Sequence, residues 1–338
     1  MRKLFALLFL IPSISVLSQE KEGDIYFQIG TSDAELYLKN YLSPLFNGIG
    51  YGFNSGWYNT AATHDRWGFD FTISANVAFI PRKDLTFTFN NSQFDHLKVS
   101  SGNSAELSTI FGPENKADRP ELTIIDDNGE ELVRATSFPG AINMKDAVGF
   151  SAVPMPMYQF GLGIIKNTDL KLRILPKISF DDASVSMIGF GLQHDLGQWF
   201  KELQWQNISI AVFAGYNQLT MKYGLNYDAP ATEENEGILN LSGFNLQALA
   251  SKEYYKIITL YGGIGYSRAG SRVRLTGTYP AGDINYQLPE DPIDFKYGDN
   301  SANVTFGITL KLVIVTVGVS HCIQNYHVTN ASVGLTIR

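Results

Sequence analysis

Only one cysteine, Cys322, occurs in the 338 residues, so the chain can form no disulfide within itself. Charged residues are scarce at 17%, and the net charge of −7 offers no basic footprint of the kind that nucleic-acid binding requires. No segment after the first residues reaches the run of about 18 apolar residues typical of a membrane-spanning helix. The best run, 310–319, is short and contains Lys311. These shortages exclude a disulfide-stapled fold, a nucleic-acid partner and a bundle of membrane helices.

The first residues are typical of a secretory signal peptide. Arg2 and Lys3 form a short positive region, residues 4–11 are apolar, and Ser18 marks a cleavage point. The apolar run is shorter than the ~20 residues that would anchor it in a bilayer. The sequence therefore predicts export, with removal of residues 1–18. An exported chain without disulfides must be stabilised by its core or by its hydrogen-bond ladder.

Strict alternation of apolar and polar residues begins near residue 50 and is clearest over 67–79. This length exceeds the ~5–6 residues of an ordinary globular strand and fits a tilted membrane strand of ~9–11 residues with its ends. Trp67 and Phe79 place aromatic rings at both ends, where the girdles of a membrane barrel lie. A soluble β-sandwich is the alternative, although its strands would not usually repeat this arrangement of aromatic ends.

The same alternation recurs along the chain, where Gly is plentiful at 31 residues and aromatics reach 13%. A sheet in hydrocarbon must close on itself, because an open edge leaves backbone N–H and C=O groups unpaired. We therefore predict an all-β fold, an antiparallel transmembrane β-barrel of 12–14 strands over residues 49–338. The twelve expected strands are 50–60, 67–79, 84–97, 150–165, 169–180, 184–195, 207–228, 238–251, 256–278, 301–311, 313–322 and 326–338.

The connections between these strands alternate in length. Outer-membrane barrels have long outer loops and short inner turns. Long, polar connections near 98–149 and 279–300 are therefore predicted as outer loops, and an even number of strands places both termini of the chain on the inner side. The tight segments 80–84 and 166–168 are predicted as inner turns. A hairpin over 122–134, turning at Asp127-Asn-Gly129, would raise the strand count to fourteen.

Residues 19–48 are predicted to hold a short helix. Ser32 with Glu35 is a capping-box pattern, and Pro44 limits the helix because proline pushes the preceding residue out of the α region. One interpretation is a plug that tucks into the barrel, and the other is an ordinary surface helix. The plug interpretation assigns apolar contacts to Leu42, Leu45 and Phe46.

Several polar side chains are predicted to point into the lumen. Their positions alternate with the apolar residues of the strands that carry them. They could line a pathway, or they could form a salt-bridged interior with no transport role. These candidates are Asp70, Asn76, Lys171, Arg173 and Lys177.

No sequence motif indicates catalysis, a metal or a cofactor. Gly-x-Ser-x-Gly is absent, and His321 and Cys322 point to opposite faces of a strand, so they do not converge on one ion. Glycines two apart, as in Gly161-Leu-Gly163, lie within strand patterns and indicate close packing rather than phosphate binding. We predict a protein that is not an enzyme and uses no cofactor. The alternative is a Ser–His site assembled across neighbouring strands.

Three stretches resemble an uncharacterised family of bacterial outer-membrane barrels. They are 41–62 (Tyr-Leu-Ser-Pro-Leu-Phe-Asn-Gly-Ile-Gly-Tyr-Gly-Phe-Asn-Ser-Gly-Trp-Tyr-Asn-Thr-Ala-Ala), Val153-Pro-Met-Pro-Met157 and 162–176. This resemblance spans most of the mature chain. More distantly, the layout is similar to the long-chain fatty acid transporter family, whose members have an N-terminal plug and a fourteen-strand barrel. That resemblance implies passive movement of hydrophobic substrates, and it assigns no ligand-binding position here. The chain departs from that family in its large first outer loop and in a possible strand count of twelve.

Two functions follow from these observations. The first is a porin-like passive channel or transporter for small hydrophobic compounds in the bacterial outer membrane, in contact with its lipid. In that case, deletion of residues 24–46 should raise ionic conductance. The second is a structural, secretion or assembly-accessory barrel that binds a protein partner through its outer loops.

Overall fold

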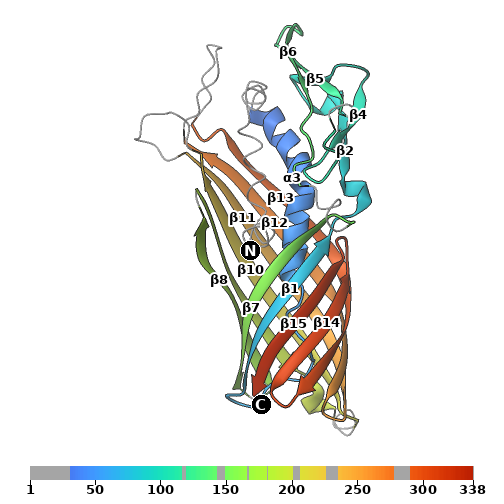
Figure 1. The fold of residues 1–338 in the computed structure, drawn as a ribbon, viewed down its shortest axis with the longest axis vertical. Coiled ribbons are helices and arrows are strands. Elements are labelled where there is room, and N and C mark those ends of the chain that lie inside the picture. The colour runs from blue at the N-terminus through green and yellow to red at the C-terminus, as the bar shows by residue number, and fades with distance from the viewer. Residues whose placement is uncertain are drawn as a thin grey trace.

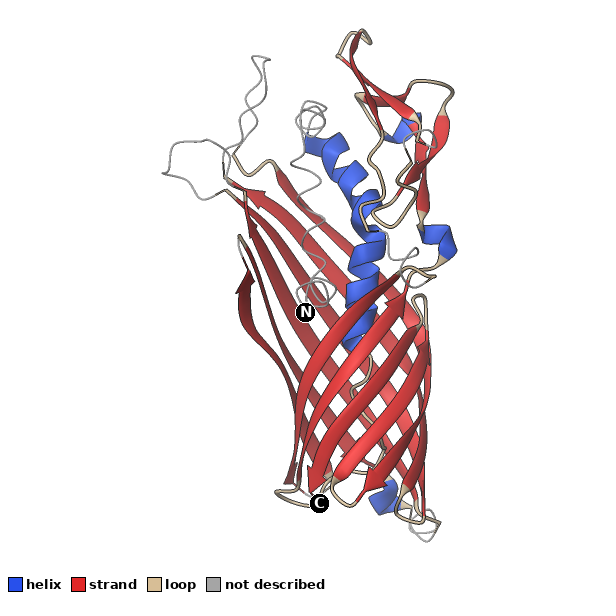
Figure 2. Ribbon diagram, in the orientation of Figure 1, coloured by secondary structure: helices blue, strands red, loops and turns tan. Residues whose placement is uncertain are grey.

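The computed structural model describes residues 31–115, 119–142, 149–165, 167–180, 182–200, 206–225, 235–277 and 290–337. The predicted signal peptide, 1–18, and the first part of the predicted plug segment, 19–30, lie outside these ranges. A tall barrel of tilted strands encloses one long helix, and a smaller group of strands stands at one end (Figure 1). Figure 2 shows how little of the described chain is helical apart from that central helix.

The barrel wall is a closed antiparallel sheet in the order β1-β15-β14-β13-β12-β11-β10-β9-β8-β7. The predicted fold class, an antiparallel transmembrane β-barrel with an N-terminal helix, is confirmed. The wall has ten strands rather than the 12–14 expected. They are β1 (Phe69–Phe79), β7 (Ala152–Ile165), β8 (Thr168–Phe180), β9 (Ala183–Asp195), β10 (Ile208–Gly224), β11 (Glu236–Tyr254), β12 (Ile258–Thr276), β13 (Ile293–Leu312), β14 (Val315–Ile323) and β15 (Val328–Ile337).

Two expected strands are missing from the wall. Residues 50–60 hold the end of a helix and a segment that runs through the lumen, because the alternating glycines there serve helix packing rather than a strand. Residues 84–97 do contain a strand, β2 (Thr86–Asn90), but it pairs with β4 (Ser104–Ser108) away from the wall. The alternation there correctly predicts a strand, but it does not predict the sheet to which that strand belongs.

A small unit of five strands, here called the β cap, stands over one end of the barrel (Figure 1). The predicted hairpin over 122–134 exists, but it forms part of the cap sheet β3-β5-β6 and adds nothing to the wall. The connection from β1 to β7 therefore covers 80–151, more than the expected 98–149, and 80–84 begins it instead of forming an inner turn. Besides β2 and β4, the cap contains β3 (Leu97–Val99), β5 (Glu121–Ile125) and β6 (Glu131–Thr136), with 3₁₀ turns at Arg82–Asp84 and Asn91–Gln93.

The two ends of the barrel differ. At one end, called the turn end, strands join through tight turns such as 255–257, where Tyr255 and Lys256 both have positive φ. The C-terminus lies there, because Ile337 is the register partner of Phe69 at the start of β1. The 3₁₀ turn Gly197–Trp199 also lies between β9 and β10 at this end. Residues 201–205 are outside the described ranges. The opposite end, the loop end, carries the cap.

Large apolar side chains cover the outside of the wall. Because neighbours along a strand point to opposite faces, these residues form a continuous lipid-facing surface, here called the apolar band. The interior positions of the same strands are buried and largely polar toward the turn end. Exposed members of the band include Phe69, Ile73, Phe160, Phe190, Leu192, Val212, Leu246, Ile264, Phe306, Val319 and Leu335.

Helix α3 (Thr31–Asn54) enters the lumen from the loop end and runs toward the turn end (Figure 2). It does not stop at Pro44 as expected. Proline removes the N–H that would bond to the carbonyl of Asn40, but the Ser43 hydroxyl donates to that oxygen at 3.0 Å. The helix therefore continues for ten residues beyond the proline. In the described part of the chain, no helix combines the length and apolarity needed to cross a membrane.

Candidate functional site

The loop end of α3 is fixed to the β cap by a buried carboxylate. Asp33 is 3% exposed, and its two oxygens accept the backbone N–H groups of Asp95 at 3.0 Å, His96 at 2.8 Å and Leu97 at 2.9 Å. Hydrogen bonds to an ionised acceptor are among the stronger ones in proteins. About two turns further along the helix, the Tyr41 hydroxyl donates to the carbonyl of Pro139 at 2.8 Å. Helix and cap are therefore joined to each other at the loop end.

The three predicted plug contacts lie where the middle of the helix meets the wall. Phe46 is buried, with its ring centre 6.4 Å from that of Phe295 and 6.0 Å from that of Tyr297, both on β13. Leu42 and Leu45 are partly buried and pack against the same apolar cluster. This part of α3 therefore fills the lumen with apolar side chains.

Beyond Phe46, glycines let the helix approach the wall closely. A Cβ on Gly50 would lie 2.4 Å from the Cβ of Ala269 on β12, and one on Gly48 would lie 2.6 Å from Val153 on β7. Gly52 is similarly close to Met155, also on β7. No side chain larger than hydrogen fits at these contacts without displacing its neighbour, so the helix lies directly against the sheet.

The last turn of α3 is capped by wall side chains from four strands. A helix end leaves carbonyl groups without partners inside the helix, and these must be satisfied when they are buried. Four interior side chains donate to carbonyls between residues 52 and 55. They are Asn76 to Gly52 and Ser55, Arg173 to Phe53 and Ser55, Asn217 to Phe53, and Asn245 to Asn54. A cation at a helix C-terminus is also favoured by the helix dipole.

Below the helix, aromatic side chains fill the lumen. Trp57 is fully buried, and its ring centre is 5.4 Å from that of Phe213. Tyr58 packs on Phe213 at 5.9 Å and on Tyr261 at 6.0 Å. These residues form a second buried cluster, separate from the one around the helix. The barrel axis is thus occupied by the helix and, toward the turn end, by this cluster.

Four of the five predicted lumen residues lie buried inside the barrel. Asn76 and Arg173 contact the end of the helix, whereas Lys171 donates to the carbonyl of Trp57 at 3.1 Å. Asp70 is 8% exposed and lies 3.7 Å from the Nε2 of His64. Lys177 differs, because it lies exposed in a bulge of β8 rather than among the buried lumen side chains. The four buried residues hold the threaded segment, a role that the alternation pattern alone did not predict.

A histidine fixes the segment near the turn end. The Nδ1 of His64 is 2.9 Å from a carboxylate oxygen of Asp169, and its Nε2 is 3.2 Å from the hydroxyl of Thr336. Asp169 also accepts the backbone N–H of His64 at 2.9 Å. The arrangement ties the chain to β8 and β15 just before β1 begins. Among the described residues no group of three or more His, Cys, Asp or Glu side chains could hold a metal ion.

The wall has a seam between β7 and β8. Their register runs only from Gln159↔Arg173 to Ile165↔Thr168, near the turn end. Toward the loop end, within the described ranges, residues 152–158 of β7 pair with β1, and residues 174–175 and 178–180 of β8 pair with β9. Figure 1 shows the two strands separating toward the loop end. We call this unpaired stretch the seam.

Prolines stand on both sides of the seam. Gly163 of β7 exchanges backbone hydrogen bonds with the segment before β1, and the carbonyl of Ser151 accepts from the N–H of Ile80. The backbone N–H and C=O groups of odd-numbered β7 residues therefore point toward β1, and those of even-numbered residues point toward β8. Pro154 and Pro156 occupy even-numbered positions, where an N–H would point across the seam. On the other side, Pro176 lies in the bulge of β8 between Leu175 and Ile178. Proline cannot donate to a ladder, so these residues keep the strands from pairing.

The interior next to the seam is apolar and rich in methionine. Met155 and Met157 of β7 and Met187 of β9 point inward and are buried. They belong to the same cluster as Ile49 and Phe53 of the helix, so the plug and the seam share one apolar interior. Methionine side chains are flexible and adapt to different neighbours. The alternation pattern does not predict this feature, although three prolines in adjacent strands are a visible signal of it.

Comparison with known proteins gives a family but no function. No curated protein matches the chain in sequence. Solved structures with loose similarity include the outer membrane protease OmpT from Escherichia coli, with 8% identity, a TM-score of 0.34, and coverage of 82% of this chain and 98% of that one. Another is the translocator domain of the autotransporter NalP from Neisseria meningitidis, with 10% identity, a TM-score of 0.28, and coverage of 91% and 98%.

A Pseudomonas aeruginosa FadL homologue has 10% identity and a TM-score of 0.28, with coverage of 80% of this chain and 63% of that one. TM-scores this low add nothing to the description of the fold. In contrast, the protein-family model described as "Family of unknown function (DUF6588)" matches residues 1–337 of the sequence. The chain therefore belongs to the family of unknown function DUF6588.

Proposed function

We propose that this protein is a passive transporter of small hydrophobic compounds in the bacterial outer membrane, and that its cargo leaves the lumen sideways through the seam. The observation that carries the proposal is the unpaired stretch of wall between β7 and β8, bordered by Pro154, Pro156 and Pro176. A sheet in lipid normally pairs every backbone group, because each unpaired group costs several kcal/mol there. Proline removes the donor that would otherwise be left unpaired, and so makes an opening tolerable.

The chemistry of the seam supports a hydrophobic cargo. Met155, Met157 and Met187 give the lumen beside the seam an apolar surface, while Tyr158 and Phe160 face lipid on the outside. A compound passing between these surfaces would meet mainly apolar side chains, and the charged side chain that borders the path is Lys177 in the β8 bulge. Ions would have no favourable environment on this path, because desolvation of a charge is costly.

The state of the lumen also supports a sideways exit. Toward the turn end, Trp57, Tyr58, Phe213 and Tyr261 fill the barrel axis, and Arg173 fixes Trp57 in place. A straight passage would require removal of this buried cluster and of the hydrogen bonds around it. A passage through the seam requires only that methionine side chains near α3 repack. We therefore assign α3 the role of a fixed inner surface beside the seam, rather than that of a stopper in an axial pore.

A disulfide across the seam tests the proposal. The register between β7 and β8 ends at Gln159↔Arg173, and its continuation would pair Tyr158 with Ile174. A disulfide between Tyr158→Cys and Ile174→Cys would therefore join the two strands where the seam begins. We would measure uptake of radiolabelled oleate by a Gram-negative host that lacks its own fatty-acid transporter. Oxidation should abolish the uptake that the protein confers, and reduction should restore it. The native Cys322 is buried and is removed as Cys322→Ser in all variants.

The matched control is Phe160→Cys with Leu172→Cys. These residues are register partners in the paired half of the same two strands and also face lipid. A disulfide there should leave uptake unchanged. Uptake that persists with the seam disulfide formed, as shown by its mobility before and after reduction, would overturn the proposal.

An assembly-accessory role is the second candidate, and the β cap favours it. The cap hairpin exposes Leu132, which is 54% accessible, at the loop end where a partner could dock. Extraction in mild detergent separates the two functions. A partner recovered in equal amount with the protein, and lost on Leu132→Asp, would favour the accessory role. Bound fatty acid without such a partner would favour transport.

A further inference from the structure

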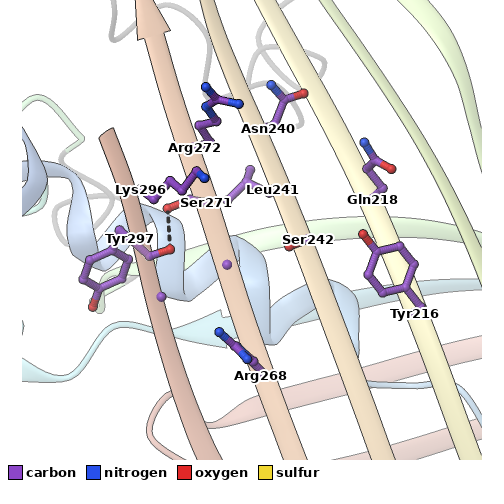
Figure 3. A pocket seen from close by; sticks show the side chains of 12 residues that line it. Tyr216, Gln218, Asn240, Leu241, Ser242, Arg268, Ser271, Arg272, Lys296 and Tyr297 are labelled. Carbon is purple, nitrogen blue, oxygen red and sulfur yellow. Dashed lines mark hydrogen bonds between the residues drawn. The ribbon is translucent and has the colours of Figure 1, made fainter. Parts of the chain in front are cut away.

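A basic depression of about 500 Å³ lies on the outside of the wall, across β10 to β13 (Figure 3). Arg268, Arg272 and Lys296 project around it. All three residues have even numbers, and the even-numbered positions in this part of β12 and β13 face outward. Their side chains therefore lie on the outside of the wall. The depression is therefore separate from the lumen and from the seam.

The shape of the depression follows from one row of small residues. Ser242, Gly270 and Gly298 are consecutive register partners across β11, β12 and β13. The rows on either side carry longer side chains, with Phe244 next to Arg268 in one and Arg272 next to Lys296 in the other. The small row thus forms the floor of a groove and the basic residues form its walls.

The groove begins where the apolar band ends. Along β12 the outward positions change from Leu260, Ile264 and Tyr266 to Arg268, Arg272 and Arg274. The exposed rings of Tyr216, Phe244 and Tyr266 form an aromatic boundary just below the basic residues. Such rings lie at the level of lipid headgroups in membrane barrels. The groove is therefore at headgroup height, on the side of the membrane that the loop end faces.

The positive charge in the groove is only partly compensated. Arg272 forms a bidentate pair with Asp294, with Nε–Oδ1 at 2.7 Å and Nη2–Oδ2 at 2.5 Å. Arg268 and Lys296 form no ion pair with any described residue. Arg272 and Lys296 are also direct register partners, and like charges in that position destabilise a sheet. Arg268 and Lys296 therefore have no directly paired carboxylate within the described part of a chain whose net charge is −7.

We propose that this groove binds the phosphate-bearing headgroup of an outer-leaflet lipid, with the acyl chains lying on the apolar band below it. Guanidinium and ammonium groups are the usual partners of phosphate, and basic pockets beside a membrane bind anionic headgroups. A phosphate between Arg268 and Lys296 compensates both charges and relieves the repulsion between Lys296 and Arg272. Leu246 and Ile264 lie beneath as contacts for the chains. This inference does not depend on the transport proposal.

The test is a titration of the detergent-solubilised full-length protein with diphosphoryl lipid A, followed by native mass spectrometry. Arg268→Gln with Lys296→Gln should weaken the apparent affinity about twenty-five-fold, because each basic group near an anionic headgroup contributes about fivefold. The control is Lys252→Gln with Lys256→Gln, which removes the same charge at the turn end. It should leave the affinity unchanged. Equal weakening by both pairs would mean nonspecific attraction and overturn the proposal.

A steric variant tests the shape without changing charge. Gly298 faces outward, and a Cβ there would meet only the Ala269 carbonyl oxygen at 3.5 Å, so Gly298→Leu can fold while filling the groove. We expect it to weaken binding as strongly as the charge variant, with heat-modifiable mobility showing intact folding. Unchanged binding would overturn the proposal. Displacement of the lipid by millimolar inorganic phosphate would also overturn it, because a site for soluble phosphate would need no lipid.

Discussion

The guanidinium carbon of Arg173 lies 3.8 Å from the centre of the Trp57 ring, and both side chains are fully buried. The same guanidinium donates to the carbonyl oxygens of Phe53, at 2.7 Å, and Ser55, at 3.0 Å. One wall residue therefore holds both the end of the helix and the aromatic cluster that follows it. This relationship makes the threaded segment part of the barrel core rather than a loosely inserted plug.

Replacement of Arg173 should destabilise the whole barrel. We expect Arg173→Met to lower the free energy of unfolding by about 3–5 kcal/mol, because two buried carbonyls lose a charged donor. Urea unfolding in lipid vesicles, followed by tryptophan fluorescence, measures this. The control is Arg66→Met, since Arg66 stacks on Trp67 at 5.4 Å but is exposed. That change should cost less than about 0.5 kcal/mol. An equal loss of unfolding free energy in the two variants would show that Arg173 does not stabilise the barrel core.

Asp33 should control how firmly the β cap is held. We expect Asp33→Asn to speed hydrogen exchange at the amides of Asp95, His96 and Leu97 about tenfold, since loss of a charge-assisted bond costs about 1.5 kcal/mol. Hydrogen-exchange mass spectrometry resolves this segment. Asp126→Asn serves as the control, because Asp126 accepts the backbone N–H of Asn128 and Glu130 in the exposed hairpin. It should leave exchange at 95–97 unaltered, and an effect there would mean that the cap responds as a whole.

The contact between Gly50 and Ala269 should be sensitive to a single methyl group. Gly50→Ala should lower stability by about 1–3 kcal/mol through overpacking, even though alanine favours a helix over glycine by about 1 kcal/mol. Adding Ala269→Gly removes the opposing Cβ, 2.4 Å from the new one, and should restore part of the loss. The thermal midpoints of the four proteins measure the coupling. Additive effects would show that the helix does not lie against β12 as described.

The two ends of the barrel should face opposite sides of the membrane, with the start of α3 at the loop end. We expect Ser32→Cys to react with a membrane-impermeant maleimide on intact cells, because Ser32 is exposed. Tyr255→Cys, in an exposed turn at the other end, should react only after permeabilisation. Cys322 is buried and should stay silent. The reverse labelling pattern would show that the turn end, not the loop end, faces the outside of the cell.

The sequence predicted the wall strands well because lipid and lumen impose opposite preferences on neighbouring residues. The alternation over 67–79 predicted β1 (Phe69–Phe79) almost to its ends. The same rule misassigned 84–97, because alternation specifies a strand but not the sheet that it joins. It also misassigned 50–60, where glycines at every second position imitate a strand while serving a close helix contact.

The site was less accessible to sequence reasoning. The inward direction of Asn76 and Arg173 followed from alternation, but their partners, the carbonyls at the end of α3, come from a distant segment. Pro44 suggested a helix end, and only the hydroxyl of Ser43 on the vacant carbonyl explains why the helix continues. The seam had a local signal in Pro154, Pro156 and Pro176, because proline in a strand indicates an edge.

Ionic conductance in a planar bilayer tests most directly the claim that the lumen is closed along its axis. The account predicts no steady conductance for the intact protein. It predicts none after deletion of residues 24–46 either, because Trp57 and its aromatic neighbours still fill the turn end, although the sequence alone predicts a rise. Heat-modifiable mobility shows that both forms are folded. Steady conductance in the intact protein, or its appearance on truncation, would contradict the account and indicate an axial pore closed only by the helix.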